Sequence, residues 1–218
     1  MTAYLIVIVV GYVIGAIPVG LIAGKLIKGI DIRERGSGKL GATNVLRTIG
    51  RPAAAVVLLL DMGKGASAVL IARIVSDSVG AQPAGALAAL VGHNWPVFTG
   101  FKGGRGTATG LGGLLLMAPW VGLAVAVAGV STLVVSRYVS LGSLVGAVVG
   151  GLTLGILSVI GVEPIEYIYY ATIGAFLIIF SHKDNVGRLL AGTERKLGEP
   201  AEPLSGAAGR AEKSGKGA

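Results

Sequence analysis

Apolar segments long enough to cross a bilayer alternate with short polar segments along most of the chain. A membrane-spanning helix needs about 20 predominantly apolar residues, and segments of roughly this length lie at about 3–26, 53–75, 82–98, 139–160 and 165–181. A helix satisfies its own backbone hydrogen bonds, which lipid cannot do. The pattern therefore predicts an all-α integral membrane protein.

The first apolar segment could also be taken for a signal peptide. However, no charged residue precedes Lys25, the apolar run is too long, and no small-residue cleavage pattern follows it. We therefore expect this segment to be retained as a transmembrane helix.

The region 106–136 is apolar but too long for one helix, and Met117-Ala118-Pro119 lies near its middle. Proline removes a helical hydrogen bond and usually marks a helix start or a kink. Two interpretations follow. One long kinked helix would give six crossings in total, and a short helix followed by a second from Pro119 would give seven.

The distribution of Lys and Arg favours seven crossings. Cytoplasmic loops concentrate these residues. Residues 25–51 contain seven of them, as does the segment 182–218. By contrast, the turns 76–82 and 161–166 contain no Lys or Arg, and their charged residues are all Asp or Glu. With seven crossings, both basic regions lie inside and both acidic turns outside. We therefore expect seven transmembrane helices, with the N-terminus outside and the C-terminus in the cytoplasm.

Composition predicts a single membrane domain. Of the 218 residues, 53% are hydrophobic and 14% are charged, against about 25% charged in soluble domains. We expect one polytopic membrane domain over 1–198 and a disordered polar tail over 199–218, which lacks apolar periodicity.

The net charge of +8 suits membrane orientation and a phosphate ligand better than nucleic acid, because aromatic residues make up only 6% and base stacking needs them. The absence of cysteine excludes disulfides and thiol catalysis.

Glycines recur at helical spacing. Gly142, Gly146 and Gly150 lie four apart, as do Gly11 and Gly15. This spacing lets helix backbones approach closely. We expect packing within one chain in preference to a dimer interface.

Three glycine-rich or basic stretches interrupt the apolar pattern, and seven crossings place all three on the cytoplasmic face. The first, GSGKLGATNVLR (36–47), lacks the spacing and the preceding strand of a nucleotide-binding P-loop. Ser37 could donate to a phosphate, and Arg47 could bind one through its planar guanidinium if a helix starts after Gly41. The alternative is a surface turn with Arg47 as an orientation charge.

The second stretch, FKGGRGTAT (101–109), follows GHNWPVF (92–98) and precedes an apolar helix. Free amides at the helix N-terminus, two hydroxyls and two cations would form a phosphate cradle. The alternative is a flexible turn between helices. His93 in the preceding segment is more often a structural histidine than a catalyst.

The third stretch, HKDNVGR (182–188), places His182, Asn185 and Arg188 at intervals of three, on one face if the helix continues. His182 could accept a proton near neutral pH, or could simply close the helix. We expect Glu194 to be a surface or structural residue. Within LLLDMGKG, Asp61 and Lys64 are three apart and could pair, either as a functional group or as a structural ion pair.

Taken together, these stretches resemble the motifs of one family. Over residues 1–196, their content and order are similar to the motifs of the bacterial acyl-phosphate:glycerol-3-phosphate acyltransferases, the PlsY family. The matching stretches are GSGKLGATNVLR, then GHNWPVF with FKGGRGTAT, and then HKDNVGRLLAGTE, with LDMGKG between the first two. The resemblance implies a multi-pass enzyme of the bacterial cell membrane with its active site facing the cytoplasm. It would transfer a fatty acyl group from acyl phosphate to position 1 of sn-glycerol 3-phosphate, giving lysophosphatidic acid and phosphate. We expect no cofactor, no metal and no nucleic acid, and a functional link to the enzyme that forms acyl phosphate.

Carried over residue by residue, the resemblance assigns a catalytic role to Ser37, Arg47, His182 and Asn185. It implies that a second group binds substrate or phosphate: Gly38, Lys39, Thr43, Asn44, Lys102, Gly103, Gly104, Arg105, Gly106 and Thr107. Two of these depart from the family's usual residue, since Lys39 stands where Asn is common and Arg105 where Lys is common. Both changes keep or add positive charge.

The chemistry of an acyl phosphate predicts direct transfer. Its carbonyl is already activated, so attack by the glycerol 1-hydroxyl needs positioning and charge stabilisation but no acyl-enzyme. We expect Ser37 and His182 to act by hydrogen bonding, while a substrate phosphate or His182 takes the proton. The alternative class, an organophosphate transporter, would show inverted repeats and paired half-helices, and neither is visible in the sequence.

Overall fold

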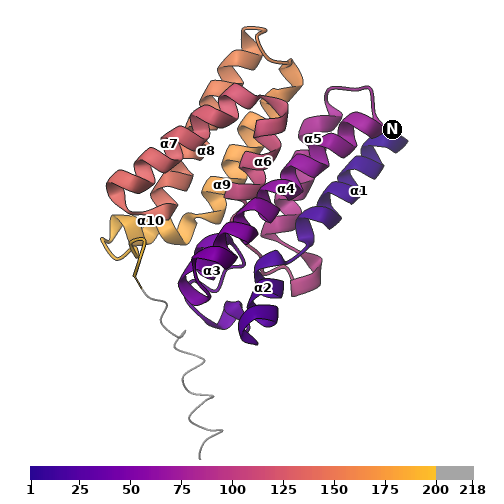
Figure 1. The fold of residues 1–218 in the computed structure, drawn as a ribbon. Helices are drawn as coiled ribbons and strands as arrows, with labels where there is room; N and C mark the ends of the chain where they lie inside the picture. Colours follow the sequence, from indigo (N-terminus) through magenta and orange to yellow (C-terminus); the bar gives the residue numbers. More distant parts are fainter. Residues whose placement is uncertain (200–218) are drawn as a thin grey trace, which may run out of the picture.

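The computed structural model describes residues 1–199, and every regular element in that range is helical (Figure 1). The predicted tail over 199–218 lies, apart from its first residue, outside the described residues. The elements are α1 (Thr2–Ala16), α2 (Val19–Lys28), η1 (Ile32–Glu34), α3 (Ala42–Thr48), α4 (Arg51–Val75), α5 (Ala81–Asn94), η2 (Val97–Thr99), α6 (Thr107–Met117), α7 (Pro119–Ser136), α8 (Val139–Val159), η3 (Ile165–Tyr167), the π-helical η4 (Tyr170–Gly174), α9 (Ala175–Ser181) and α10 (Lys183–Leu190).

The helices pack in two groups that meet along the middle of the molecule. Helices α1, α4, α5 and α6 lie side by side, and α7 and α8 form a pair beside them (Figure 1). The segment η4–α9 contacts α8, and η4 also contacts α5, so it joins the two groups. The buried cluster around Leu114, Val121, Leu154 and Tyr170 lies at this junction.

Proline residues place two of the helix breaks. The prediction of a break at Met117-Ala118-Pro119 is confirmed, because α6 ends at Met117 and α7 begins at Pro119. The first segment, predicted as one helix over 3–26, is divided: α1 ends at Ala16, and α2 begins after Pro18. Proline has no N–H to continue the hydrogen-bond ladder, which explains both breaks.

Glycines bring the helix backbones into contact, as predicted. A Cβ added at Gly11 would lie 2.7 Å from the carbonyl oxygen of Gly85, and one at Gly15 would overlap the backbone of Ala89. On α8, Gly142 faces the backbone of Gly129 on α7 in the same way. The glycine spacing therefore serves packing within the chain, between α1 and α5 and between α7 and α8.

The outer surface of the helices is apolar. Val134 and Val135 on α7 are 70% and 87% exposed, and Leu59 on α4 is 66% exposed. Continuous exposed apolar surface of this kind fits contact with lipid. Within residues 1–199, four helical segments are long and apolar enough to span a membrane, or five if the bent segment 165–190 counts as one; α5 and α6 are shorter than such a span.

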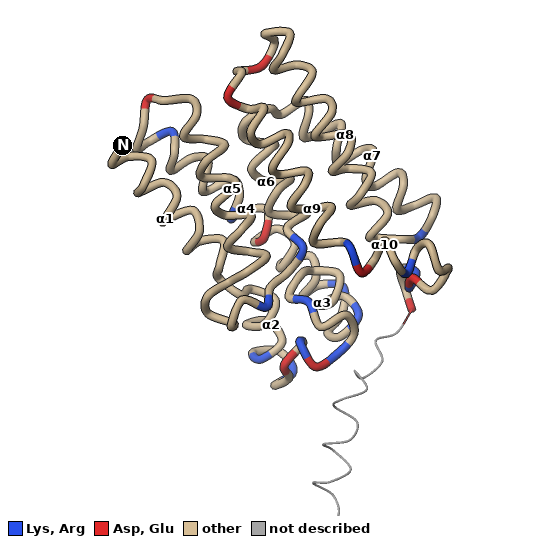
Figure 2. The backbone as a smooth tube through the Cα atoms, turned by 180° about the vertical axis from the view of Figure 1, so that it is seen from behind, with Lys and Arg blue, Asp and Glu red and all other residues tan. Residues whose placement is uncertain are grey.

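Charge is distributed unevenly between the two ends of the molecule. Lys and Arg gather at the end that holds α2, α3 and α10 (Figure 2). At the opposite end, the loop between α4 and α5 carries Asp77, and the loop after α8 carries Glu163 and Glu166. Arg73 in the last turn of α4 also lies toward that end. All three predicted functional stretches are at the basic end.

Candidate active site

Asn44 holds the first glycine-rich loop in place. Its amide donates to the carbonyl oxygens of Ile32, at 2.8 Å, and Arg35, at 3.2 Å, and its Oδ1 accepts from the Ser37 backbone N–H at 3.0 Å. Asn44 is only 1% exposed. Helix α3 starts after Gly41, which meets the condition stated in the sequence analysis. These bonds fix the Ser37 backbone, so Asn44 supports the loop, and its direct contact with phosphate stays a prediction.

The second loop packs on the C-terminal end of α5. The Gly104 N–H donates to the carbonyl oxygen of His93 at 3.0 Å, and the Leu40 N–H donates to the Gly103 carbonyl at 3.4 Å, which joins the first and second loops. Gly106 has φ of 78° and caps α6, a left-handed conformation that favours glycine. Burial, reinforced by the charge of Arg188, lowers the pKa of Arg105 to about 10, which leaves its guanidinium protonated at neutral pH.

The third stretch bends, so the helix does not continue straight through it. Helix α9 ends at Ser181, α10 begins at Lys183, and the axes differ by 59°. His182 occupies the bend and its Nδ1 lies 2.8 Å from the carbonyl oxygen of Ile178. A carbonyl only accepts, so Nδ1 carries the proton and Nε2 is free to accept in the neutral ring. Burial lowers the pKa of His182 to about 4, opposed by the Ile178 hydrogen bond and aided by Arg105, so the ring is neutral at physiological pH.

Glu194 belongs to this site, and the sequence analysis placed it only as a surface or structural residue. Its side chain is 6% exposed and accepts from Ser140 at 2.7 Å, from Asn185 at 2.6 Å and from Arg188 at 2.7 Å. Burial alone would raise the pKa of Glu194, but these three hydrogen bonds lower it below its ordinary value. The carboxylate is therefore charged and joins α8 and α10.

The segment after α10 crosses back over the first loop. Arg47 donates to the backbone carbonyl of Arg195 at 3.3 Å, and Arg195 donates to the Gly36 carbonyl at 3.1 Å. The Nε of Arg47 is buried and has no protein partner. Burial and the neighbouring charge of Arg195 lower the pKa of Arg47. Part of the Arg47 guanidinium is thus left to bind another acceptor.

A polar pocket of about 190 Å³ brings most of the predicted residues together. The predicted residues that line it are Ser37, Lys39, Thr43, Asn44, Arg47, Arg105, Gly106, Thr107, His182 and Asn185. Four predicted residues do not line it: Gly38, Lys102, Gly103 and Gly104. Of these, Lys102 is exposed, and Gly103 and Gly104 are buried in the loop that supports Arg105.

Five polar residues that were not predicted as substrate ligands also line this pocket: Asp61, His93, Ser140, Ser143 and Glu194. Asp61 and Lys64 form the predicted ion pair, with 2.7 Å between Oδ1 and Nζ. The three cations Lys39, Arg47 and Arg105 line one pocket, which favours an anionic ligand.

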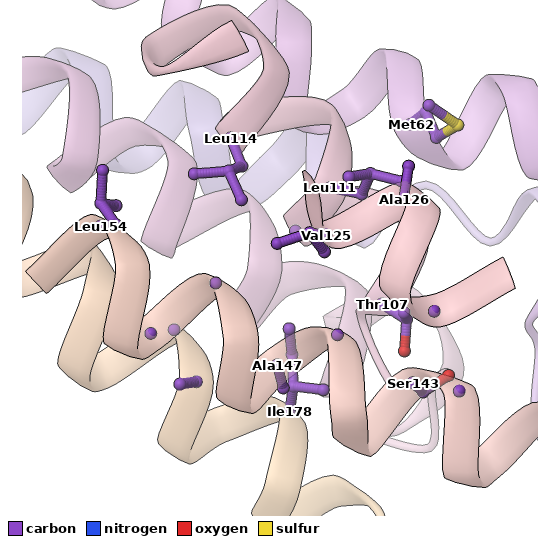
Figure 3. A pocket seen from close by; sticks show the side chains of 18 of the residues that line it. Met62, Thr107, Leu111, Leu114, Val125, Ala126, Ser143, Ala147, Leu154 and Ile178 are labelled. Atoms are coloured by element: carbon purple, nitrogen blue, oxygen red, sulfur yellow. The ribbon is translucent and has the colours of Figure 1, made fainter. Parts of the chain in front are cut away.

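An apolar cleft of about 270 Å³ opens beside the polar pocket (Figure 3). Its walls come from α4, α6, α7, α8 and the η4–α9 segment. The cleft and the polar pocket share five lining residues: Leu58, Thr107, Leu111, Val139 and Ser143. The two spaces therefore meet, and together they suit a molecule with an anionic head and an apolar chain.

Comparison with known proteins identifies relatives over nearly the whole chain. The family model of glycerol-3-phosphate acyltransferase matches residues 5–192. The glycerol-3-phosphate acyltransferase of Synechococcus sp. (strain CC9902) is 45% identical over 195 residues, which cover 89% of this chain and 96% of the relative. That of Thermoanaerobacter sp. (strain X514) is 45% identical over 194 residues, with the same coverage.

Solved structures show the same fold. The crystal structure of PlsY (YgiH), an integral membrane glycerol 3-phosphate acyltransferase, in its glycerol 3-phosphate form, has a TM-score of 0.82 and 38% identity, covering 91% of this chain and 96% of the other. The lysophosphatidic acid form of that protein has a TM-score of 0.81 and 37% identity, with the same coverage.

Proposed function

This chain belongs to the glycerol-3-phosphate acyltransferase family, and from that premise we propose that it transfers a fatty acyl group from acyl phosphate to the 1-hydroxyl of sn-glycerol 3-phosphate. The products are lysophosphatidic acid and inorganic phosphate. The relatives' names support the acceptor, the product form of the related structure supports lysophosphatidic acid, and the choice of acyl phosphate as donor is our proposal.

The observation that carries the proposal is the boundary shared by the polar pocket and the apolar cleft. Ser143 and Thr107 line both spaces, so the acyl carbonyl would lie near them, with the phosphates on the cationic side and the acyl chain between α6, α7 and α8. Lysophosphatidic acid has this division between a phosphate head and an apolar chain. The geometry thus matches a substrate pair that becomes one amphiphile.

Cations on different loops would bind the phosphates of the two substrates. Arg47 is half-buried, lines the pocket together with Ser37 and retains an unpartnered Nε, while Lys39 faces the pocket from the first loop and Arg105 from the second. Hydrogen bonds to charged groups are worth about 1.5–3 kcal/mol each. We assign Ser37, Arg47, His182 and Asn185 to the reacting site, and the loops around Lys39 and Arg105 to phosphate binding.

In the reaction, the glycerol 1-hydroxyl oxygen bonds to the acyl carbon, and the bond from that carbon to the phosphate oxygen breaks. Phosphate leaves with the electron pair. The hydroxyl proton passes to a substrate phosphate or to the free Nε2 of His182. Arg47 and Arg105 stabilise charge on the phosphates, and no acyl-enzyme is formed.

The membrane arrangement is part of the proposal. Seven crossings by residues 1–198, with α5 and α6 as short crossings, place the basic end of the molecule in the cytoplasm under the positive-inside rule. The N-terminus is then outside, and the polar pocket opens toward the cytoplasm of a bacterial cell. Both substrates, and the enzyme that forms acyl phosphate, would be reached from that side.

An assay of the purified protein tests the function. Glycerol 3-phosphate is supplied with acyl phosphate, acyl-CoA or acyl carrier protein as donor, and lysophosphatidic acid is measured. Of the three donors, we expect only acyl phosphate to give product. Product from either thioester would refute the assignment of acyl phosphate as the donor. An acylated Ser37, or release of phosphate before glycerol 3-phosphate binds, would refute direct transfer. Uptake into liposomes without chemical conversion would favour a transporter instead.

A further inference from the structure

A buried charged cluster lies behind the second loop, and the proposed reaction does not use it. Asp61 and Lys64 on α4 are 2% and 6% exposed. Lys64 also donates a 2.6 Å hydrogen bond to the carbonyl oxygen of Ile17, at the break between α1 and α2. A buried ion pair costs desolvation and is weak support for stability by itself, so another role has to account for it.

The cluster extends to the glycine-rich loop through His93. The His93 Nδ1 lies 3.6 Å from Asp61 Oδ1, and the ring is 6% exposed. The ring covers Gly104: a Cβ added there would overlap Nε2 and lie 2.7 Å from Cδ2 and 2.9 Å from Cε1. The Gly104 N–H also donates to the His93 backbone carbonyl. His93 thus contacts Gly104 through both its side chain and its backbone.

We propose that His93 is a positioning residue: its imidazole, which lies against the Asp61–Lys64 pair, sets the path of the backbone at Gly104 and hence the position of Arg105 in the polar pocket. This inference rests on the proposed function only in that Arg105 binds a substrate phosphate. Active sites are sensitive to such support, because a misplacement of about 1 Å can cost on the order of 100-fold in rate.

A rescue experiment tests the contact directly. Gly104→Ala should lower the Tm of the purified protein and reduce, at least about tenfold, its affinity for glycerol 3-phosphate, measured by ligand-induced stabilisation. His93→Ala removes all three atoms nearest to the new methyl group. The double variant should therefore recover Tm and bind glycerol 3-phosphate more tightly than Gly104→Ala does, up to the affinity of His93→Ala alone.

Gly103→Ala supplies the matched control. A Cβ at Gly103 would overlap the backbone carbonyl oxygen of His93 and meet that of Asn94 at 2.6 Å and Pro96 Cδ at 2.5 Å; His93→Ala changes only a side chain and leaves all three in place. Gly103→Ala should therefore stay impaired when combined with His93→Ala. Equal rescue of both glycine variants would overturn the inference, because relief would then be general loosening.

The charged pair is tested without leaving an unpaired charge. Asp61→Asn combined with Lys64→Met removes both charges, which avoids the cost of a single buried ion. We expect the same loss of glycerol 3-phosphate affinity as His93→Ala gives, with no further loss when all three changes are combined, since they act through one contact. Additive losses would show that the pair does not act through His93.

The outcomes separate this inference from the proposed function. If Gly104→Ala is not rescued in Tm, or is rescued in Tm but not in affinity, the positioning role of His93 is refuted. The opposite outcome is also possible: the wild type binds glycerol 3-phosphate and the variants show the rescue, but the wild type forms no lysophosphatidic acid. That result would refute the proposed function and leave the inference intact.

Discussion

The side-chain amide of Asn185 donates a 2.6 Å hydrogen bond to Oε1 of Glu194, the oxygen that also accepts from Ser140 at 2.7 Å. One carboxylate thereby orients a residue of α10 and the start of α8 at the edge of the polar pocket. Because Arg188 pairs with the second oxygen at 2.7 Å, Glu194 is fully engaged and acts on the site by fixing its neighbours.

Glu194→Ala should therefore damage the site more than Glu194→Gln. Alanine leaves three donors without their acceptor, at a cost of about 1–3 kcal/mol for each buried group. Glutamine keeps an oxygen for Asn185 and Ser140 and loses only the ion pair and hydrogen bond with Arg188, because its NH2 group replaces the second oxygen. Tm in detergent and kcat/KM for glycerol 3-phosphate measure the effect. If the alanine variant matched the wild type in both, Glu194 would not organise the site.

Arg47→Ala should reduce activity strongly while leaving insertion and Tm nearly unchanged. A lost charge-assisted contact of about 1.5–3 kcal/mol corresponds to roughly ten- to 150-fold in kcat/KM. Arg51→Ala, an exposed cation at the start of α4, is the control for a general loss of charge and should retain activity. Arg105→Lys should be mild, since it keeps the charge. Near-normal turnover of Arg47→Ala would make the phosphate assignment wrong.

Much of this site could be predicted from residue types and spacing. The three polar stretches stand out from the apolar helices, the Asp61–Lys64 pairing follows from their interval on one helix, and the short helix before Pro119 follows from the chemistry of proline. These are local features. Each depends on a few neighbouring residues, which the sequence displays directly.

The parts that could not be predicted depend on contacts distant in sequence. Glu194 lies 54 residues from Ser140, and nothing in its local sequence marks it as a buried acceptor. The same holds for the contact between His93 and Gly104, because only the fold shows which ring atoms occupy the space beside a glycine. The bend at His182 was not predicted, because neither proline nor glycine is present there. It is accompanied by the hydrogen bond from His182 Nδ1 to the Ile178 carbonyl oxygen and by the burial of Asn185.

The pH dependence of His182 follows from its burial. Since the folded protein lowers the pKa of His182 from 6.5 to about 4, the unfolded chain takes up a proton first, and stability should fall as the pH drops from about 6.5 toward 4. Above 6.5 the ring is neutral in both states. The ratio of kcat between wild type and His182→Asn, which cancels titration of the substrates, should stay constant between about pH 6 and 8. A step in that ratio near 6.5 would show an ordinary, exposed histidine.

The proposed sidedness predicts the location of two reporters. A fusion at residue 164, in the acidic loop after α8, should be accessible from outside, and a fusion at the C-terminus should be in the cytoplasm. The reason is the separation of basic and acidic ends (Figure 2). A cytoplasmic reporter at 164, or an external C-terminus, would place the polar pocket on the wrong side for the proposed substrates.

The apolar cleft predicts a limit on acyl-chain length. It extends along α8 from Ser143, which it shares with the polar pocket, to Leu154, near Leu114 (Figure 3). Position 154 lies 11 residues beyond position 143 on the helix, which is about 16 Å at the rise of an α-helix. An extended chain gains about 1.2 Å per bond, so the cleft accommodates roughly 13 carbons beyond the carboxyl end.

Two substitutions should move that limit in opposite directions. Leu154→Ala removes a fully buried side chain and should shift the preferred acyl phosphate toward longer chains. Gly150→Val should shift it toward shorter ones, because even a Cβ there lies 2.9 Å from Val125 Cγ2 and 3.6 Å from Leu114 Cδ2. Two methylenes are worth about 1.6 kcal/mol of apolar burial. In each cleft variant, the ratio of kcat/KM between two acyl phosphates that differ by two carbons should therefore change roughly tenfold from its wild-type value. Leu152→Ala, on the exposed side of α8, should leave the profile unchanged. If both cleft variants remain active and keep the wild-type profile, the acyl chain does not lie between α6, α7 and α8.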